Sequence, residues 1–188
     1  MTLVIGIELP EGGVMMGADS FVGSDGDNCN ADIKKVRRRG HVLIGVSGGI
    51  ASQDFFKHIF KVPRYSGESP HRWVAEVFGE AVRKQLREST IPAALIDGDV
   101  LVGVGGKLFA LQDRIGTHGF RDGFGVIGSG SAWAQGSLEM TPHLKPRTRI
   151  RKALEVTAKY SGSVRPPWAF LTGGKVQPAA LRPEVTSA

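Results

Sequence analysis

The chain has 188 residues, 41% of them hydrophobic, and carries a formal net charge of +6 with a pI near 9.7. This length and apolar content predict one domain with a substantial core and argue against two independent domains. The single cysteine, Cys29, excludes an intramolecular disulfide framework and suits a reducing, cytoplasmic location. No apolar run approaches the roughly 20 residues of a membrane span, and the first apolar segment lacks the basic start of a signal peptide.

Two basic runs, 34–39 and 145–152, hold much of the positive charge. The charge permits contact with nucleic acid, but neither run is interleaved with the aromatic residues of a base-stacking platform. We therefore expect solvated or inter-subunit faces and no nucleic-acid partner.

In the first half, residues 2–9 and 13–19 are β-prone runs separated by Pro-Glu-Gly-Gly, which predicts a hairpin. The charged run then leads into a strand at 41–47, and residues 50–60 have helical apolar spacing. A clearer helix follows Ser69 as its cap, with Pro70 in the first turn. Its apolar stripe comprises Val74, Val77, Phe78, Ala81, Val82 and Leu86.

In the second half, residues 91–127 predict a β-meander of strands at 91–96, within 101–111 and at 124–128, with a turn at 97–99. Helices follow from about 131 to 138 and from about 148 to 160, then a strand at 168–172 and a loosely packed tail from about 173. This order predicts an α+β fold. Two antiparallel sheets pack face to face between helix pairs, as a four-layer αββα sandwich over the single domain 1–188.

Three familiar ligand motifs fail on inspection. The segment 103–107 lacks the leading glycine and the following Ser or Thr of a phosphate loop, so it is predicted to be a strand pair with a tight turn. Residues 25–36 begin like a calcium loop but have Asn30 and Val36 where glycine and glutamate are needed. The histidines show no zinc-site spacing. We expect no metal and no cofactor.

The chemistry-bearing residues near the front are Thr2, Asp19 and Lys35. A threonine hydroxyl needs a neighbouring base to act as a nucleophile. If Met1 is removed, the freed α-amine of Thr2 supplies that base, since its ordinary pKa is about 7.7 to 8. A lysine cation would favour the neutral amine and the developing alkoxide, and an aspartate would hold that lysine in place. On spacing alone, the three residues better suit a strand start, a strand end and a charge on a strand surface.

Several segments in order resemble proteasome β-subunits and especially the bacterial HslV proteins, which are N-terminal nucleophile (Ntn) hydrolases. The resemblance runs from Thr2 to about Thr172, and it is carried by the segments TLVIGI (2–7), GVMMGADS (13–20), DIKKVRR (32–38), VLIGVSGG (42–49), LVGVGGKLFAL (101–111) and VIGSGSAWAQ (126–135). Each segment alone is weak, but their order over this length is specific. The resemblance implies the αββα sandwich and a threonine peptidase.

The resemblance also assigns roles to single residues. It makes Thr2 the nucleophile, Asp19 and Lys35 its electrostatic partners, and the Gly49 N–H the oxyanion donor. Ser129 matches a serine that hydrogen-bonds near the nucleophile's amine, although as a residue before a helix it also suits an N-cap.

Further positions follow from the same resemblance. Ser161 lies in a Tyr-Ser-Gly segment and is expected to support the site. The substrate-binding positions implied are Phe21, Gly23, Ser47 and Gly49.

One position departs from the family pattern. The aspartate expected three residues before Ser161 is replaced by Ala158, and Glu155 lies one turn earlier, where it would substitute only if the helix were rotated or shifted. Its absence predicts weaker orientation of Ser129 and the Thr2 amine.

The function implied is peptide-bond hydrolysis inside a self-compartmentalised assembly of stacked homo-oligomeric rings, with a ring-shaped ATPase unfoldase as partner. Two alternatives stay open. One is a catalytically silent ring or scaffold subunit, motivated by Ala158. The other is an Ntn amidohydrolase acting on a small amide.

Overall fold

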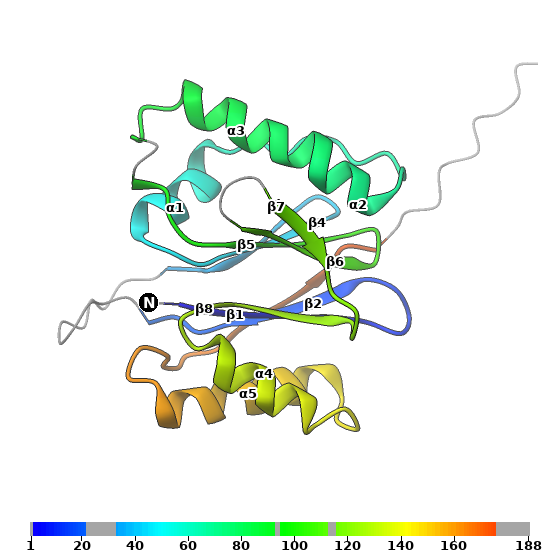
Figure 1. The fold of residues 1–188 in the computed structure, drawn as a ribbon, viewed down its shortest axis with the longest axis vertical. Helices are drawn as coiled ribbons and strands as arrows, with labels where there is room; N and C mark the ends of the chain where they lie inside the picture. The colour runs from blue at the N-terminus through cyan, green and yellow to red at the C-terminus, as the bar shows by residue number, and fades with distance from the viewer. Residues whose placement is uncertain (1, 22–32, 93–94, 113–115, 176–188) are drawn as a thin grey trace, which may run out of the picture.

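The computed structural model describes residues 2–21, 33–92, 95–112 and 116–175. Two antiparallel sheets form its centre (Figure 1). The four-stranded sheet has the order β8 (Phe124–Gly128), β1 (Leu3–Glu8), β2 (Val14–Ala18) and β9 (Ala169–Gly173). The five-stranded sheet has the order β3 (Val36–Arg39), β4 (Val42–Val46), β5 (Val100–Val104), β6 (Lys107–Gln112) and β7 (Gly116–Gly119).

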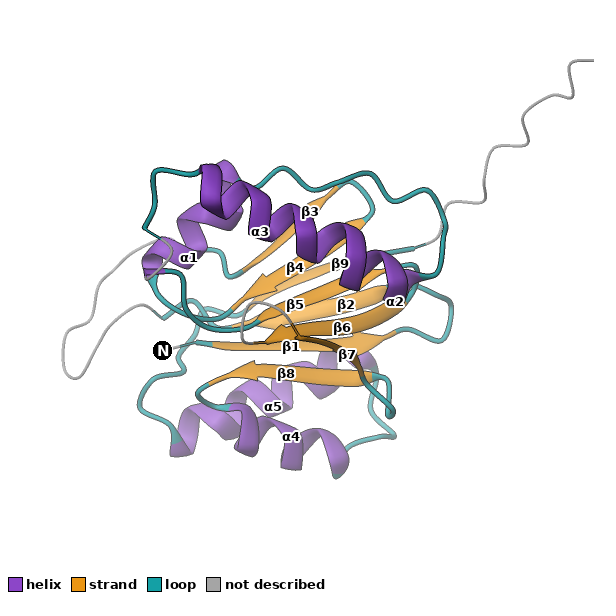
Figure 2. Cartoon of the chain, turned by 45° about the horizontal axis from the view of Figure 1, so that its top comes forward, coloured by secondary structure: helices purple, strands orange, loops and turns teal. Residues whose placement is uncertain are grey.

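Helices cover the outer face of each sheet (Figure 2). On the five-stranded sheet lie α1 (Ile50–Asp54), which continues as a π-helical segment, and a longer helix made of α2 (Pro70–Arg72), a π-helical segment and α3 (Gly79–Glu88). On the four-stranded sheet lie α4 (Ser131–Glu139) and α5 (Pro146–Tyr160). No helix within the described residues is long and apolar enough to cross a membrane.

The two sheets bury a shared apolar core between their facing sides. Val4 and Met16 of one sheet pack in the same cluster as Leu43, Leu101 and Leu108 of the other. A Cβ on Gly6 would lie 2.7 Å from a Leu108 methyl, so a side chain at Gly6 would require Leu108 to move. Gly6 lies in β1, the strand that begins beside Thr2, so the two sheets pack closely along the strand that leads to the site.

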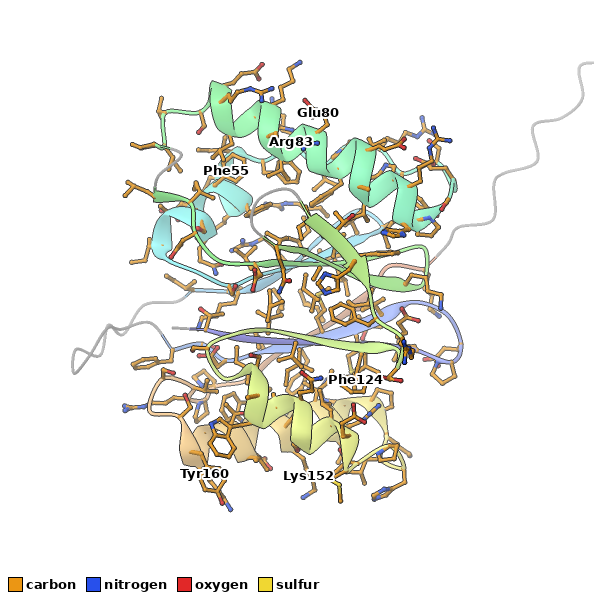
Figure 3. The ribbon with its side chains drawn as sticks, viewed as in Figure 1. Phe55, Glu80, Arg83, Phe124, Lys152 and Tyr160 are labelled. Atoms are coloured by element: carbon orange, nitrogen blue, oxygen red, sulfur yellow. The ribbon has the colours of Figure 1, made fainter. Side chains whose placement is uncertain are left out.

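Each helix layer presents an apolar side to its sheet and a polar side outward. Phe55 and Phe124 are buried in the clusters beneath the two layers, whereas Glu80 and Arg83 form an exposed ion pair on α3 (Figure 3). Tyr160 projects from the outer side of α5. The α+β class with two antiparallel sheets, predicted from the order of elements, is confirmed.

The described elements differ from the sequence prediction in part of the charged run, at 91–96, at β7 and at the start of the tail. In the charged run, Lys34, Arg38 and Arg39 are exposed, as expected of a solvated face, but residues 36–39 form β3 and Arg37 is buried. Its guanidinium donates to the carbonyls of Gln53 and Lys34, which stabilises the buried charge. Of the predicted strand 91–96, the described residues 91–92 and 95–96 are not strand, and Pro92 lacks the N–H that a sheet ladder needs.

The third difference is β7, which the sequence did not predict because Gly-Thr-His-Gly has no apolar alternation. It pairs with β6 as an edge strand. At the C-terminal end, the loosely packed tail was predicted from about 173, but Gly173 belongs to β9 and the buried Gly174 accepts the Gly106 N–H at its carbonyl. The rest of that tail, from residue 176, lies outside the described residues.

Candidate active site

The β1–β2 hairpin brings Asp19 back beside Thr2. The turn closes through two hydrogen bonds, from the Leu9 N–H to the Gly13 carbonyl and from the Gly12 N–H to the Leu9 carbonyl. Gly12 and Gly13 have positive φ, which glycine adopts without strain. At the open end of the hairpin, the Leu3 N–H donates to the Asp19 carboxylate over 2.8 Å. Thr2 is therefore fixed at the head of β1, and it is 3% exposed.

Lys35 reaches the same point from the other sheet. Its Nζ lies 2.9 Å from each carboxylate oxygen of Asp19 and 2.6 Å from the carbonyl oxygen of Phe21. The Phe21 N–H also donates to Asp19, over 3.1 Å. The structure thus brings Asp19 and Lys35 together, as the sequence predicted. The pair lies beside Leu3, the residue after Thr2, because Asp19 accepts the Leu3 N–H.

Burial dominates the electrostatics of this pair. It raises the pKa of Asp19 above its ordinary value, while the Lys35 charge and the hydrogen bonds from Leu3, Lys35 and Phe21 act in the opposite direction. Burial lowers the pKa of Lys35, and the attraction of Asp19 opposes that change. Lys35 is held by Asp19, whose carboxylate also accepts the Leu3 N–H of the Thr2–Leu3 peptide. In its charged form, Lys35 would stabilise a negative charge that develops there.

Ser129 contacts Thr2 through the main chain. Its N–H donates to the Thr2 carbonyl over 3.0 Å. The preceding Gly128 has φ of 103°, and a Cβ there would lie 1.9 Å from the Thr2 oxygen, so only glycine allows this approach. The N-cap alternative for Ser129 is wrong, because the N-cap of α4 is Gly130 and the Ser129 hydroxyl faces another serine.

That serine is Ser163, which the sequence reasoning missed. Its Oγ lies 2.8 Å from the Oγ of Ser161 and 3.4 Å from the Oγ of Ser129. Ser161 is thus connected to Ser129 only through Ser163 in these hydrogen bonds. Glu155, the carboxylate considered as a substitute for the missing aspartate, is exposed on α5.

The predicted oxyanion donor already has an acceptor. The Gly49 N–H donates to Oδ1 of Asp97 over 2.7 Å, and the Ser52 hydroxyl lies 3.0 Å from the same oxygen. The chains cross closely here, since a Cβ on Gly48 would lie 2.3 Å from the Asp97 carbonyl oxygen. Residues 97–99 were predicted only as a turn, so Asp97 is a second residue that the sequence did not reveal.

The other three predicted substrate-binding positions, Ser47, Phe21 and Gly23, do not form one group in the described residues. The Ser47 hydroxyl accepts the Asp99 N–H over 2.7 Å, so it anchors the same loop that carries Asp97. Phe21 is half-buried, with the Arg165 guanidinium 5.0 Å from its ring centroid. Gly23 lies outside the described residues.

A cavity of about 480 Å³ lies on one side of the loop that carries Asp97. Asp97 and Asp99 line this cavity, whereas Thr2, Lys35 and Gly49 do not. Its lining residues are Phe56, Val82, Arg83, Leu86, Arg87, Ile96, Asp97, Gly98, Asp99, Val100 and Leu111. The cavity leaves space beside Asp97 and is not itself the place where Thr2 would act.

Comparisons with known proteins give a match by structure alone. No protein-family model and no curated protein matches the sequence. A structure of Thiobacillus denitrificans BPH in complex with epoxomicin is 20% identical, with a TM-score of 0.71 over 93% of this chain and 100% of that one. The HslV structure from Trypanosoma brucei is 16% identical, with a TM-score of 0.66 over 91% and 98%.

This chain has the fold of HslV. An Anbu (Gly-1) mutant from Hyphomicrobium sp. strain MC1 agrees, at 18% identity and a TM-score of 0.67 over 92% of this chain and 81% of that one. The structural comparison confirms the resemblance to HslV-like proteasome β-subunits that the sequence predicted. In this HslV-like fold, Thr2, Asp19, Lys35 and Ser129 meet at one end of the four-stranded sheet.

Proposed function

We propose that this chain is an N-terminal threonine peptidase of the HslV type, built as the αββα sandwich of the Ntn hydrolases and active after loss of Met1. The observation that carries the proposal is the buried Lys35–Asp19 pair beside the Thr2 peptide. A lysine 2% exposed and held by a carboxylate is costly to bury, and such costs concentrate at functional sites.

The mechanism follows from the groups around Thr2. The Thr2 hydroxyl attacks the substrate's peptide carbonyl and gives its proton to the α-amine, while Lys35 stabilises the alkoxide. The tetrahedral intermediate collapses as the protonated amine donates to the leaving nitrogen. The resulting ester is hydrolysed by a water that the α-amine deprotonates, which regenerates the Thr2 hydroxyl and releases a carboxylic acid.

The Gly49 N–H must change its acceptor during this cycle. It donates to the Asp97 carboxylate in the structure, and it donates to the substrate oxygen once the Asp97 side chain has moved away. The cavity beside the loop provides space for this shift.

We propose further that the chain forms stacked rings in the cytoplasm with Thr2 facing an internal chamber, as the resemblance to HslV implies. Its substrates would be polypeptides, delivered by a separate ring-shaped ATPase unfoldase. The similarity of the fold to HslV across 91% of the chain supports this assembly.

The test begins with the intact mass of the purified chain, which is expected to lack Met1. Peptide hydrolysis by the wild type is then compared with Thr2→Ala, which should be inactive, and with Thr172→Ala, an exposed threonine on β9 that should keep full activity. A β-lactone probe should acylate the Thr2 hydroxyl of the wild type and of Thr172→Ala but should not react with Thr2→Ala. Retention of Met1, or equal rates for wild type and Thr2→Ala, would overturn the proposal.

A second candidate is the catalytically silent ring subunit. It is favoured by the occupied Gly49 N–H and by Ala158 in place of a carboxylate. Rings in native mass spectrometry, together with no hydrolysis and no acylation, would select it. A stable monomer that hydrolyses small amides would instead select the amidohydrolase.

A further inference from the structure

Three serine hydroxyls from two distant segments form a chain beside Thr2. Ser161 and Ser163 lie in the turn that follows α5, where their oxygens are 2.8 Å apart. Ser163 then approaches Ser129, which lies after β8, with 3.4 Å between the oxygens. Ser163 is 3% exposed, whereas Ser129 is exposed, so the contact is shielded from water on the Ser163 side only.

The last member of the chain is fixed against Thr2. The Ser129 N–H donates to the Thr2 carbonyl, and Gly128 leaves no room for a side chain between them. On the other side, a Cβ on Gly130 would lie 2.4 Å from the Thr157 methyl and 3.3 Å from Val164. The segment that carries Ser129 is therefore held between Thr2 and the end of α5.

We propose that Ser163 is a positioning residue for the Thr2 reaction, one that takes the place of the carboxylate missing at Ala158. This inference rests on the proposed peptidase function. A hydroxyl both donates and accepts, so Ser163 links Ser161 to Ser129 without a charged group. Hydrogen bonds in a chain polarise one another, and the Ser129 hydroxyl is thereby oriented toward the amine that Met1 removal creates.

Two contacts distinguish a positioning role for Ser163 from a role in stabilising its own turn. The Ser161 contact alone would satisfy the Ser163 hydroxyl within its own turn, which also has a Val164 N–H to Ser161 carbonyl contact of 3.4 Å. The approach to Ser129 crosses to another segment 34 residues away. Ser163 therefore acts through Ser129, and its effect on the reaction should disappear when Ser129 has no hydroxyl.

The test measures kcat and KM for peptide hydrolysis in Ser163→Ala, Ser161→Ala, Ser129→Ala and the Ser129→Ala/Ser163→Ala double variant. We expect Ser163→Ala to lower kcat about tenfold, the equivalent of one lost hydrogen bond, with KM unchanged. Ser161→Ala should change kcat in the same direction. In the Ser129→Ala background, Ser163→Ala should have no further effect.

The matched control is Ser89→Ala, which removes a hydroxyl that lies 2.9 Å from the Leu86 carbonyl at the end of α3. It should leave kcat unchanged, and the melting temperature of every variant shows whether the chain is folded. If Ser163→Ala keeps the wild-type kcat, or lowers it equally with and without the Ser129 hydroxyl, the inference is wrong and the peptidase stands. If the wild type neither hydrolyses peptides nor reacts with the β-lactone, the proposed function fails and this inference fails with it.

Discussion

Lys35 and Asp19 join the two sheets at the site, with Nζ 2.9 Å from both carboxylate oxygens. Asp19 follows β2 of the four-stranded sheet, and Lys35 precedes β3 of the five-stranded sheet. The side chains are 0% and 2% exposed, so neither charge has water as an alternative partner. The same contact therefore supports both the packing of the sheets and the electrostatics around Thr2.

Asp19→Ala should destabilise the protein strongly, because it leaves the Lys35 charge buried without its partner. We expect a loss of about 3–5 kcal/mol in the free energy of unfolding, measured by urea denaturation. The Asp19→Ala/Lys35→Met double variant should regain part of that loss, since no unpaired charge remains. A double variant less stable than Asp19→Ala would contradict this account of the pair.

The lowered pKa of Lys35 predicts opposite pH trends for stability and activity. Its pKa in the folded state lies below the ordinary 10.5, so between the two values the unfolded chain binds a proton that the folded chain does not. The contribution of Lys35 to the free energy of unfolding therefore rises as the pH increases from the folded pKa to 10.5. As the pH decreases again to the folded pKa, this contribution is lost. Activity should instead fall as the pH increases through this window, because the Lys35 cation disappears.

These trends can be measured together. The kcat for peptide hydrolysis should have an alkaline limb below the ordinary lysine pKa of 10.5, while urea denaturation at the same pH values follows stability. An alkaline limb at or above that value would show that the Lys35 charge is not required or that its pKa is not lowered.

Much of the fold was predictable because the determining patterns are local. The hairpin between β1 and β2 follows from apolar runs on either side of a Gly-Gly turn, and α5 follows from apolar spacing. β3 was missed because its sequence, VRRR, has the composition of a surface run. Its buried Arg37 is stabilised by the carbonyl of Gln53, 16 residues away, and such a contact leaves no local pattern.

The candidate site shows the same division. Asp19 and Lys35 were found as charged residues close to Thr2 in the sequence, the resemblance assigned their roles, and the structure brings the two side chains together. Asp97 and Ser163 were missed because their decisive contacts join residues 48 and 34 positions apart. Aspartate and serine are also common in turns, so neither residue stands out in a single sequence.

Asp97→Ala should raise activity and lower stability. Without the carboxylate, the Gly49 N–H is free for the substrate oxygen, so kcat/KM for peptide hydrolysis should increase. The loop also loses its contacts to Gly49 and Ser52, each of which should cost about 0.5–1.5 kcal/mol in urea denaturation.

Asp54→Ala is the control for Asp97→Ala, because it removes an exposed carboxylate at the other end of α1. It should leave kcat/KM unchanged. A fall in kcat/KM for Asp97→Ala would mean that Asp97 holds Gly49 in its working position instead of competing for it.

Gly128→Ala should displace Thr2 while leaving the rest of the fold in place. The new Cβ would lie 1.9 Å from the Thr2 carbonyl oxygen at a φ of 103°, so the Thr2 peptide must move. We expect a loss of about 1–3 kcal/mol in stability from the strained backbone and a fall of about 100-fold in kcat/KM from the displaced nucleophile.

Gly136→Ala is the matched control, since no atom outside the helix's own backbone lies within 4 Å of a Cβ there in α4. That control should gain about 0.5–1 kcal/mol and keep its activity. If Gly128→Ala instead hydrolyses peptides at the wild-type rate, the reacting group is not held by the contact between β8 and Thr2.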